Sequence, residues 1–252
     1  MNLVLFEPDE QRQGTVVLTG RRADHIRNIL RPAAGDTLRV GEINGAVGSG
    51  VVEKIDEASV VLTVDLDRKP PSLPDIELIL ALPRPIMLQR IVKQATTLGV
   101  RRFHLIRSRR VEKSFFHSPI LGPEKMRSLL TEGLEQAMDT RLPEVRVYHR
   151  FKPFVEDVLP TLVGYGLLAH PSATDSLSVV WKNSRKNRSE KNREEGRNQI
   201  LLAVGPEGGF SDYECRQFLR QGFTMFTMGP RILHVDTAVV ALLAQILLLQ
   251  AG

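Results

Sequence analysis

The chain has 252 residues, of which 42% are hydrophobic and 25% are charged. This composition excludes collagen-like and wholly disordered chains, and the length suits one large domain or two unequal ones. The single cysteine, Cys215, excludes a disulfide framework and a zinc site with two or more thiolates. The first ten residues lack the basic start of a signal peptide, and the longest apolar run, 238–249, is too short to span a bilayer. We therefore expect a cytoplasmic protein with no metal and no membrane contact.

The net charge of +5 is distributed unevenly along the chain. Residues 182–197 carry seven basic and three acidic side chains, a net charge of +4. Residues 84–113 carry nine basic and one acidic side chain, a net charge of +8. The local basic stretch at 84–113 therefore favours a nucleic-acid partner more than the overall charge does.

The first seventy residues predict a small β-barrel domain, residues 1–70. Short β-like runs alternate with glycine-containing turns, and one short helix is expected near 23–30. The predicted strands are 15–19, 37–42, 50–55 and 60–66. The segment KPPSLP, residues 69–74, has three prolines in six residues and predicts a stiff linker.

Residues 75–252 alternate between buried strands and amphipathic helices, which predicts an α/β domain with a mostly parallel sheet. The predicted strands are 76–82, 103–106, 166–169, 200–204 and 223–228. The predicted helices are 87–98, 126–137, 211–221 and 236–249. Residues 182–198 contain no apolar side chain, so we expect a flexible surface insertion there, with an RNA-contacting arm as the alternative.

The sharpest local pattern is Ala203-Val204-Gly205-Pro206-Glu207-Gly208-Gly209-Phe210-Ser211. A buried strand leads into a glycine-rich loop, and Ser211 with Glu214 forms a capping box that begins the next helix. Glycine permits close approach of a ligand to the backbone, and open α/β sheets bind nucleotides at the carboxyl ends of their strands. The pattern predicts a ligand site, although an ordinary strand-to-helix turn is the alternative.

A second loop, 228–238, also lies between a strand and a helix. Pro230 fixes the backbone, Arg231 offers five hydrogen-bond donors, and Asp236 or Thr237 can cap the final helix. Two such loops at one sheet edge can enclose a single ligand. The chain contains no P-loop, no H-E-x-x-H zinc motif and no G-x-S-x-G elbow.

These two loops, Gly205-Pro206-Glu207-Gly208-Gly209-Phe210 and Gly229-Pro230-Arg231-Ile232-Leu233, resemble the paired signatures of the SPOUT superfamily of methyltransferases. Within it, the chain resembles the bacterial 16S rRNA (uracil N3)-methyltransferase family, RsmE. Residues 25–31 with Gly35-Asp36 are similar to that family's PUA-like N-terminal domain. Residues 93–100, KQATTLGV, and Glu135-Gln136 are similar to two further family stretches. The likeness extends over nearly the whole chain.

The resemblance implies that residues 75–252 form a trefoil-knotted SPOUT domain, that residues 1–70 are PUA-like, and that the protein is a homodimer. It also implies S-adenosylmethionine as cofactor, bent into the knot. The implied cofactor-binding residues come from three segments and the final helix. They are Leu168, Ala169, His170, Val204, Gly205, Pro206, Glu207, Gly208, Gly209, Met228, Gly229, Pro230, Ile232, Leu233 and Thr237.

The activity that the resemblance implies is methylation of a uridine N3 in 16S rRNA of the small ribosomal subunit. Positioning and removal of the N3 proton are the protein's tasks. Arg231 is the candidate to stabilise the uracil anion, and Glu207, His234 or Asp236 can assist deprotonation. Candidate RNA contacts are Arg22, His25, Arg27, Arg31, Arg101, Arg102, Arg107, Arg109, Arg110, Lys113 and Arg141. A solvated charged face is the alternative for the cluster at 101–113.

The chain departs from the family pattern at two places. Residues 137–140, Ala-Met-Asp-Thr, stand where the family has a small residue, glycine and arginine, and His234 and Asp236 stand where it has arginine and glutamate. Two alternative functions therefore remain open. One is a SPOUT enzyme that methylates a tRNA base or a ribose 2′-hydroxyl, and the other is a non-enzymatic RNA-binding factor of ribosome assembly.

Overall fold

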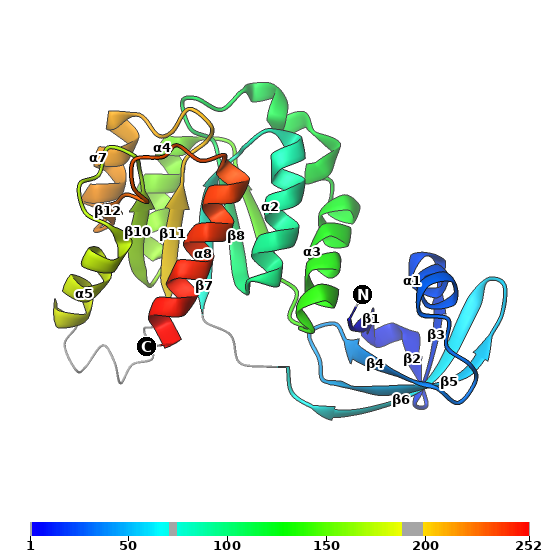
Figure 1. The fold of residues 1–252 in the computed structure, drawn as a ribbon. Coiled ribbons are helices and arrows are strands. Elements are labelled where there is room, and N and C mark those ends of the chain that lie inside the picture. The colour runs from blue at the N-terminus through cyan, green and yellow to red at the C-terminus, as the bar shows by residue number, and fades with distance from the viewer. Residues whose placement is uncertain (1, 71–74, 188–198, 252) are drawn as a thin grey trace. The chain divides into compact units, whose positions relative to one another are not determined.

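The computed structural model describes residues 2–70, 75–187 and 199–251. The chain forms two compact units, one of residues 1–72 and 128–142 and the other of residues 73–127 and 143–252 (Figure 1). Residues 71–74, the core of the expected linker, lie outside the described residues. The segment 128–142 thus groups with the first unit, whereas sequence analysis placed it in 75–252.

The first unit contains a six-stranded sheet in the order β1-β4-β5-β6-β3-β2. β1 is parallel to β4 and the other pairs are antiparallel. Its apolar side chains, such as Phe6, Leu18 and Leu62, form one buried core. The strands are β1 (Val4–Phe6), β2 (Gln11–Arg12), β3 (Thr15–Thr19), β4 (Thr37–Glu42), β5 (Val47–Ile55) and β6 (Ser59–Arg68).

Two short helical segments complete this unit between β3 and β4. Helix α1 (Gly20–His25) continues into a π-helical turn, Ile26–Leu30, which ends at Arg31 in the left-handed region. A 3-10 turn, Pro8–Glu10, precedes β2. The predicted strands and helix of this region are confirmed, whereas β1 and β2 are too short to show a periodic pattern.

The segment 128–142 joins the first unit through α3 (Pro123–Ala137). Leu134 packs in a small cluster with Leu3, Leu5 and Ile43. The Glu135 carboxylate accepts two hydrogen bonds from the Arg21 guanidinium, at 2.7 and 3.1 Å. A bidentate arginine pair with a buried carboxylate fixes geometry as well as charge, which explains why this part of α3 belongs with the small sheet.

The described part of the second unit contains a six-stranded parallel sheet in the order β12-β10-β11-β7-β8-β9. The predicted α/β fold with a parallel sheet is confirmed. β7 is buried at all six positions, as expected for a strand covered on both faces. The strands are β7 (Ile76–Ala81), β8 (Val100–Ile106), β9 (Glu144–Tyr148), β10 (Tyr165–Ala169), β11 (Ile200–Val204) and β12 (Thr224–Phe226).

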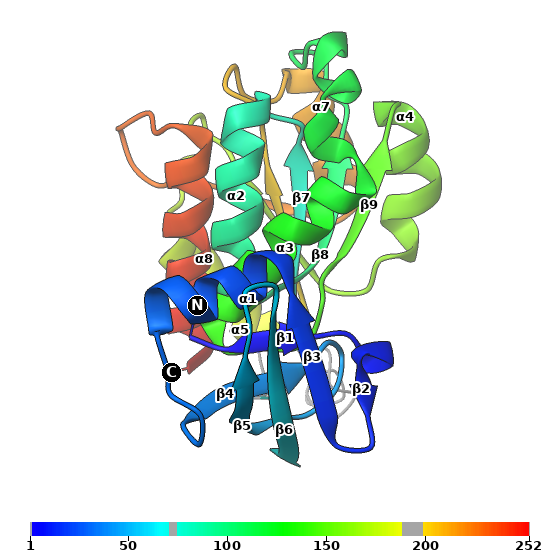
Figure 2. The ribbon, with the colours of Figure 1, turned by 90° about the vertical axis from the view of Figure 1, so that its right-hand side faces the viewer.

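Helices cover both faces of this sheet. α2 and α8 lie on one face and α4 and α7 on the other, as the two views show (Figures 1 and 2). The helices are α2 (Pro85–Thr97), α4 (Phe151–Pro153), α5 (Leu177–Asn187), α7 (Asp212–Arg220) and α8 (Val235–Ala251). Shorter turns are Lys113–His117, Pro119–Leu121, Phe154–Val158 and Leu159–Thr161. Among the described residues, no helix has the length and apolar character needed to cross a membrane.

One prediction about this unit is wrong in part. Residues 182–187 were expected in a flexible insertion, but they form the end of α5. Trp181 and Ser184 are buried, and the Ser184 hydroxyl donates to the Trp181 carbonyl oxygen at 2.8 Å. Because these two side chains are buried, the helix continues past Trp181. The remainder of the expected insertion, 188–198, lies outside the described residues.

The route of the chain after β12 creates the functional edge of the sheet. β12 is an edge strand, yet α8 packs against α2, the helix that follows the central strand β7. The connection 227–234 therefore crosses the carboxyl ends of β10 and β11. Three strand-to-helix connections, after β10, β11 and β12, meet there.

Candidate active site

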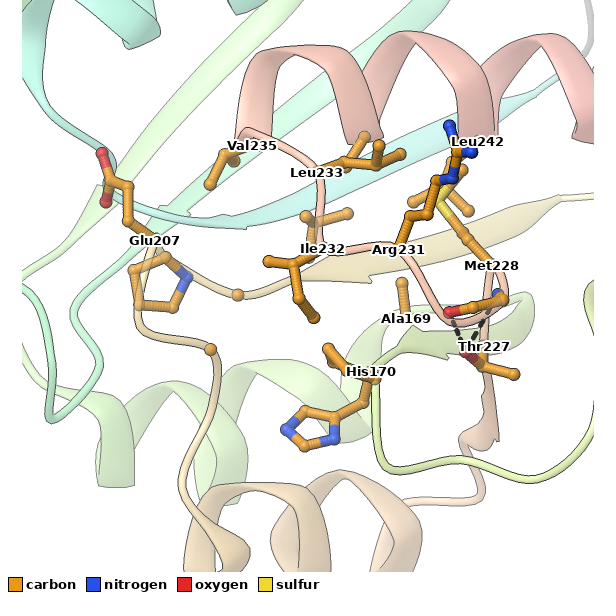
Figure 3. Close-up of a pocket in the computed structure, with 17 residues that line it drawn as sticks. Ala169, His170, Glu207, Thr227, Met228, Arg231, Ile232, Leu233, Val235 and Leu242 are labelled. Carbon is orange, nitrogen blue, oxygen red and sulfur yellow. Dashed lines mark hydrogen bonds between the residues drawn. The ribbon is translucent and has the colours of Figure 1, made fainter.

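A concave pocket lies where these three connections meet, and Figure 3 shows its side chains. It encloses about 680 Å³, including space open to solvent. Of the predicted cofactor residues, eleven line it, namely Ala169, His170, Val204, Gly205, Pro206, Glu207, Gly209, Met228, Gly229, Ile232 and Leu233. Four others, Leu168, Gly208, Pro230 and Thr237, are not among its described lining residues.

Sequence reasoning missed five lining residues. They are Pro171, Thr227, Val235, Ala238 and Leu242. Pro171 and Thr227 each adjoin a predicted segment, so a wider window on the same loops would have included them. Ala238 and Leu242 lie four residues apart on α8, and that helical spacing places both on one face.

The loop after β11, residues 205–211 (the glycine loop), has a tight internal structure. The Gly209 amide donates to the Pro206 carbonyl oxygen at 2.7 Å, and Gly209 has φ +71°, which favours glycine. A Cβ at Gly205 would lie 2.9 Å from the backbone nitrogen of Phe210. The predicted capping box is confirmed, because Ser211 Oγ accepts from the Glu214 amide and the Glu214 carboxylate accepts from the Ser211 amide.

Three contacts from elsewhere in the unit hold the glycine loop and the first turn of the helix that follows it. The Arg84 amide, at the start of α2, donates to Glu207 Oε1 at 3.1 Å. The Arg110 guanidinium donates to the Gly208 carbonyl oxygen. The Arg109 amide donates to Glu214 Oε1 at 2.6 Å. The loop is therefore fixed on its outer side before any ligand binds.

The loop after β12, residues 227–234 (the crossing loop), is held mainly at its ends. The Thr227 amide donates to the Asp175 carbonyl oxygen at 2.8 Å, and the Thr227 hydroxyl contacts Gly229, whose φ is +107°. Ile232 is 76% exposed and Leu233 is 37% exposed, although both line the pocket. Arg231 is exposed and has no ion pair within the described residues.

The four predicted catalytic residues occupy different surroundings. Arg231 and Glu207 line the pocket, whereas His234 and Asp236 are not among its described lining residues. Asp236 lies in the first turn of α8, where Oδ2 is 3.4 Å from Arg90 Nη1 and Oδ1 accepts from the Thr237 amide. The exposed His234 contributes its carbonyl oxygen to the first turn of α8, where it accepts from Ala238. Both residues thus support the start of α8.

His170 and Cys215 adjoin the glycine loop from either side. His170 Nε2 lies 3.3 Å from the Phe210 carbonyl oxygen, and Nδ1 lies 2.7 Å from Ser172 Oγ. Cys215 is buried on α7, and burial raises the pKa of its thiol, with Asp212 and Glu214 adding in the same direction. This thiol is therefore poorly reactive at neutral pH.

The RNA-contact candidates of the first unit are engaged by their own neighbours. Arg22 binds both Glu10 carboxylate oxygens, at 2.5 and 2.6 Å, which lowers the pKa of Glu10. Arg27 pairs with Asp24, and Arg141 pairs with the buried Asp139 at 3.0 Å. The Arg31 Nε donates to the Asn28 carbonyl oxygen, and burial lowers the pKa of His25.

The candidates of the second unit divide into engaged and available groups. Arg102 bonds to the buried Glu77 and to Glu144, and Arg110 holds Gly208 as described above. Arg101 Nη1 is buried without a hydrogen-bond partner within the described residues. Lys113 is exposed at the start of a 3-10 turn. Arg107 and Arg109 line a second concave region.

Among the described residues, no group of three or more His, Cys, Asp or Glu has a metal-binding arrangement.

Comparisons with known proteins agree with this architecture. The family model described as "RNA methyltransferase domain" matches residues 70–247. The ribosomal RNA small subunit methyltransferase E of Treponema pallidum (strain Nichols) is 32% identical over 98% of this chain and 91% of its own length. The protein of the same name from Synechocystis sp. is 27% identical over 96% of this chain and 76% of its own length.

Two solved structures share the fold. A methyltransferase of Legionella pneumophila, solved in complex with the bound cofactor SAM, superposes with a TM-score of 0.74 and 21% identity over 99% of this chain and 97% of its own. A ribosomal RNA small subunit methyltransferase E of Neisseria gonorrhoeae, bound to S-adenosyl methionine, gives 0.72 and 20% identity over 97% and 96%. With the family model covering most of the chain and a full-length relative at 32% identity, the chain belongs to the ribosomal RNA small subunit methyltransferase E family and is an RNA methyltransferase.

Proposed function

We propose that the protein transfers the methyl group of S-adenosylmethionine to N3 of a uridine in 16S rRNA of the small ribosomal subunit. The observation that carries the proposal is the exposed Arg231 guanidinium, which has no ion pair within 2–70, 75–187 and 199–251 and lines a pocket built from three strand ends. The family relationship supports RNA as the substrate, and the name of the curated relatives supports ribosomal RNA of the small subunit.

The residues of the pocket fit this cofactor. A Cβ at Gly205 would collide with backbone atoms, so the loop needs glycine for its close turn. Val204, Leu233 and Leu242 give the pocket an apolar wall suited to the adenine ring and the aliphatic chain. Glu207 adds one carboxylate to the otherwise uncharged wall formed by the glycine loop.

The sulfonium of S-adenosylmethionine, when bound, supplies an activated methyl group. The protein's residues then have to position the uracil and remove its N3 proton. Arg231 stabilises the negative charge that develops on the uracil ring. Glu207 is the single carboxylate among the described lining residues, and its Oε1 already accepts from Arg84, so Oε2 is the proposed acceptor of the proton.

The test is a comparison of 16S rRNA from a strain that lacks the gene with rRNA from the same strain after complementation. We expect N3-methyluridine to disappear in the deletion strain, to return with the wild-type gene, and to stay absent with Arg231→Ala. Calorimetry on purified Arg231→Ala should show retained binding of S-adenosylmethionine. Unchanged N3-methyluridine in the deletion strain would exclude the assignment, and another lost modification would identify the alternative target.

Three structural expectations belong to the same proposal. The chain connection across β10 and β11 supports the trefoil knot that the SPOUT resemblance implies. The six-stranded sheet of the first unit supports a PUA-like barrel within 1–70, followed by the methyltransferase domain over 75–252. Action on ribosomal RNA supports a cytoplasmic location.

A homodimer is the final part of the proposal. Most side chains of α8 are apolar, and the helix lies beside α2. Ile86 on α2 is 62% exposed and Leu248 on α8 is 74% exposed. Exposed apolar side chains on two adjacent helices favour contact with a second copy. Analytical ultracentrifugation should give twice the monomer mass, and Leu248→Glu should reduce that mass to the monomer value.

A further inference from the structure

A second concave region lies on the α/β unit, apart from the cofactor pocket. Its walls come from the residues after β8, the residues after β9 and the first turn of α7. It encloses about 1300 Å³, including its open mouth. The strands β8 and β9 are adjacent and parallel, so their carboxyl ends meet at the same sheet edge as the cofactor loops.

The charge of this region is strongly positive. Arg107, Arg109 and Arg150 line it and have no ion pair within the described residues. Lys152 adds a fourth cation, which makes an exposed contact of 3.7 Å with Glu156. Glu214, the one carboxylate among the described residues that line the region, is buried. It already accepts hydrogen bonds from the Arg109 amide and from the amide and hydroxyl of Ser211. Its charge is thus held inside the fold, whereas Arg109 and Arg150 are exposed.

The uncharged groups of the region suit a nucleotide. Tyr213 is 48% exposed, and its ring centroid lies 6.4 Å from that of Phe151, which also lines the wall. Exposed aromatic rings beside cations are the usual platform for single-stranded nucleic acid.

We propose that this region binds a single-stranded RNA nucleotide close to the target uridine. The phosphate groups lie on Arg107, Arg109 and Arg150, and the base stacks on Tyr213. The inference rests on the proposed function for the role of the RNA. It goes beyond the proposed function because it assigns phosphate contact to Arg150 and base stacking to Tyr213, two residues that no sequence motif indicated. Ser211, the last residue of the glycine loop, and Glu214, its capping-box partner on α7, both line this wall, so the bound strand and the cofactor share one structural support.

The experiment measures binding of a short single-stranded 16S rRNA fragment to the full chain by fluorescence anisotropy at several salt concentrations. Arg109→Ala combined with Arg150→Ala should weaken binding at least tenfold and reduce the slope of log K against log salt by about 1.4, since two phosphate contacts are lost. Tyr213→Ala should weaken binding roughly five- to hundredfold without changing the slope. Tyr213→Phe keeps the ring and should bind like the wild type.

The matched control is Arg220→Ala, an exposed arginine at the opposite end of α7. It should leave RNA affinity within a factor of two. All variants change exposed side chains, and thermal unfolding together with calorimetry on S-adenosylmethionine checks that fold and cofactor binding are retained. Wild-type RNA affinity in the double variant would overturn the proposal that this region binds RNA. A loss of RNA affinity in Arg220→Ala equal to that in the double variant would overturn it as well.

Failure of this inference and failure of the proposed function give different results. If the double variant loses RNA affinity but the wild type leaves uridine N3 unmodified, RNA binding in the second concave region is supported and uridine N3 is rejected as the target. If N3-methyluridine forms at the wild-type rate and with the wild-type KM for RNA in the double variant, the target assignment stands and the pocket is rejected. A raised KM with unchanged kcat supports both.

Discussion

The glycine loop and the crossing loop line the same pocket, yet they are held in opposite ways. The glycine loop has an internal turn and hydrogen bonds from Arg84 and Arg110, and the capping box at its end is held by the Arg109 amide. The crossing loop exposes Arg231, Ile232 and Leu233. One wall of the site is therefore preorganised, and the other has exposed side chains that a bound ligand would cover. The preorganised glycine loop fixes the shape of the site at no further entropic cost, whereas burial of the exposed crossing-loop side chains by a ligand contributes binding free energy.

The largest expected effect concerns the preorganised wall. Gly205→Ala places a Cβ 2.9 Å from the Phe210 backbone nitrogen, and backbone cannot move aside cheaply. Overpacking of this kind costs about 1–3 kcal/mol, so S-adenosylmethionine affinity should fall by up to about a hundredfold in calorimetry. Gly208→Ala is the matched control, because its Cβ would meet only the flexible Arg110 side chain, at 2.9 Å. Equal losses in both variants would show that the loop is not the rigid wall.

A smaller effect is expected at the uncovered wall. Ile232→Ala removes apolar surface that a bound cofactor would cover, and partial burial of such a side chain contributes about 1–1.5 kcal/mol. Affinity for S-adenosylmethionine should therefore fall about tenfold, while the melting temperature stays unchanged because Ile232 is 76% exposed. A lowered melting temperature without ligand would mean that the crossing loop is packed rather than open.

Thiol labelling compares the two walls directly. Cys215, behind the glycine loop, is buried and has a raised pKa, so at pH 7–8 it is less ionised than a free thiol and its labelling rate should rise as pH increases. A cysteine introduced by Ile232→Cys should react roughly tenfold faster or more at the same pH. S-adenosylmethionine should protect the introduced thiol and leave the Cys215 rate unchanged. Similar labelling rates for Cys215 and for the introduced cysteine would contradict the difference in accessibility between the glycine loop and the crossing loop.

The smallest expected change in free energy concerns Glu207, where stability and catalysis can be measured separately. Glu207→Ala removes the acceptor for the Arg84 amide and should lower the free energy of unfolding by about 1 kcal/mol. Glu207→Gln keeps an oxygen acceptor and should be as stable as the wild type. If Glu207 is the base, methyl transfer should be lost in both variants, whereas activity in the Gln variant would assign Glu207 to structure alone. Urea unfolding and single-turnover methylation measure the two properties.

Local patterns allowed accurate prediction of the parts that short segments specify. The Ser211–Glu214 capping box and the buried strand β7 both depend on residues within a few positions of one another. β9 was missed, although Glu144–Tyr148 alternates polar and apolar side chains, because it is a short, partly exposed edge strand. Its alternation was the available signal.

Contacts between distant segments could not be predicted from local patterns. Glu207 accepts a hydrogen bond from a residue 123 positions away, and Arg110 reaches a carbonyl oxygen 98 positions away. The charge cluster at 101–113 predicted cations on a surface, but the fold alone separates Arg109, which lines the second concave region, from Arg110, which holds the glycine loop. Strand order, which brings these segments together, leaves no periodic trace in the sequence.

The return of the chain from β12 to α8 also affects biosynthesis. The wall formed by 227–242 is translated after every strand of the parallel sheet, so a nascent chain cannot form the pocket while that segment is still inside the ribosome. Docking of α8 against α2 joins segments more than 130 residues apart, and such distant contacts form slowly. A newly made molecule should therefore pass through a compact but inactive stage, and activity in a pulse of synthesis should lag behind the appearance of full-length protein.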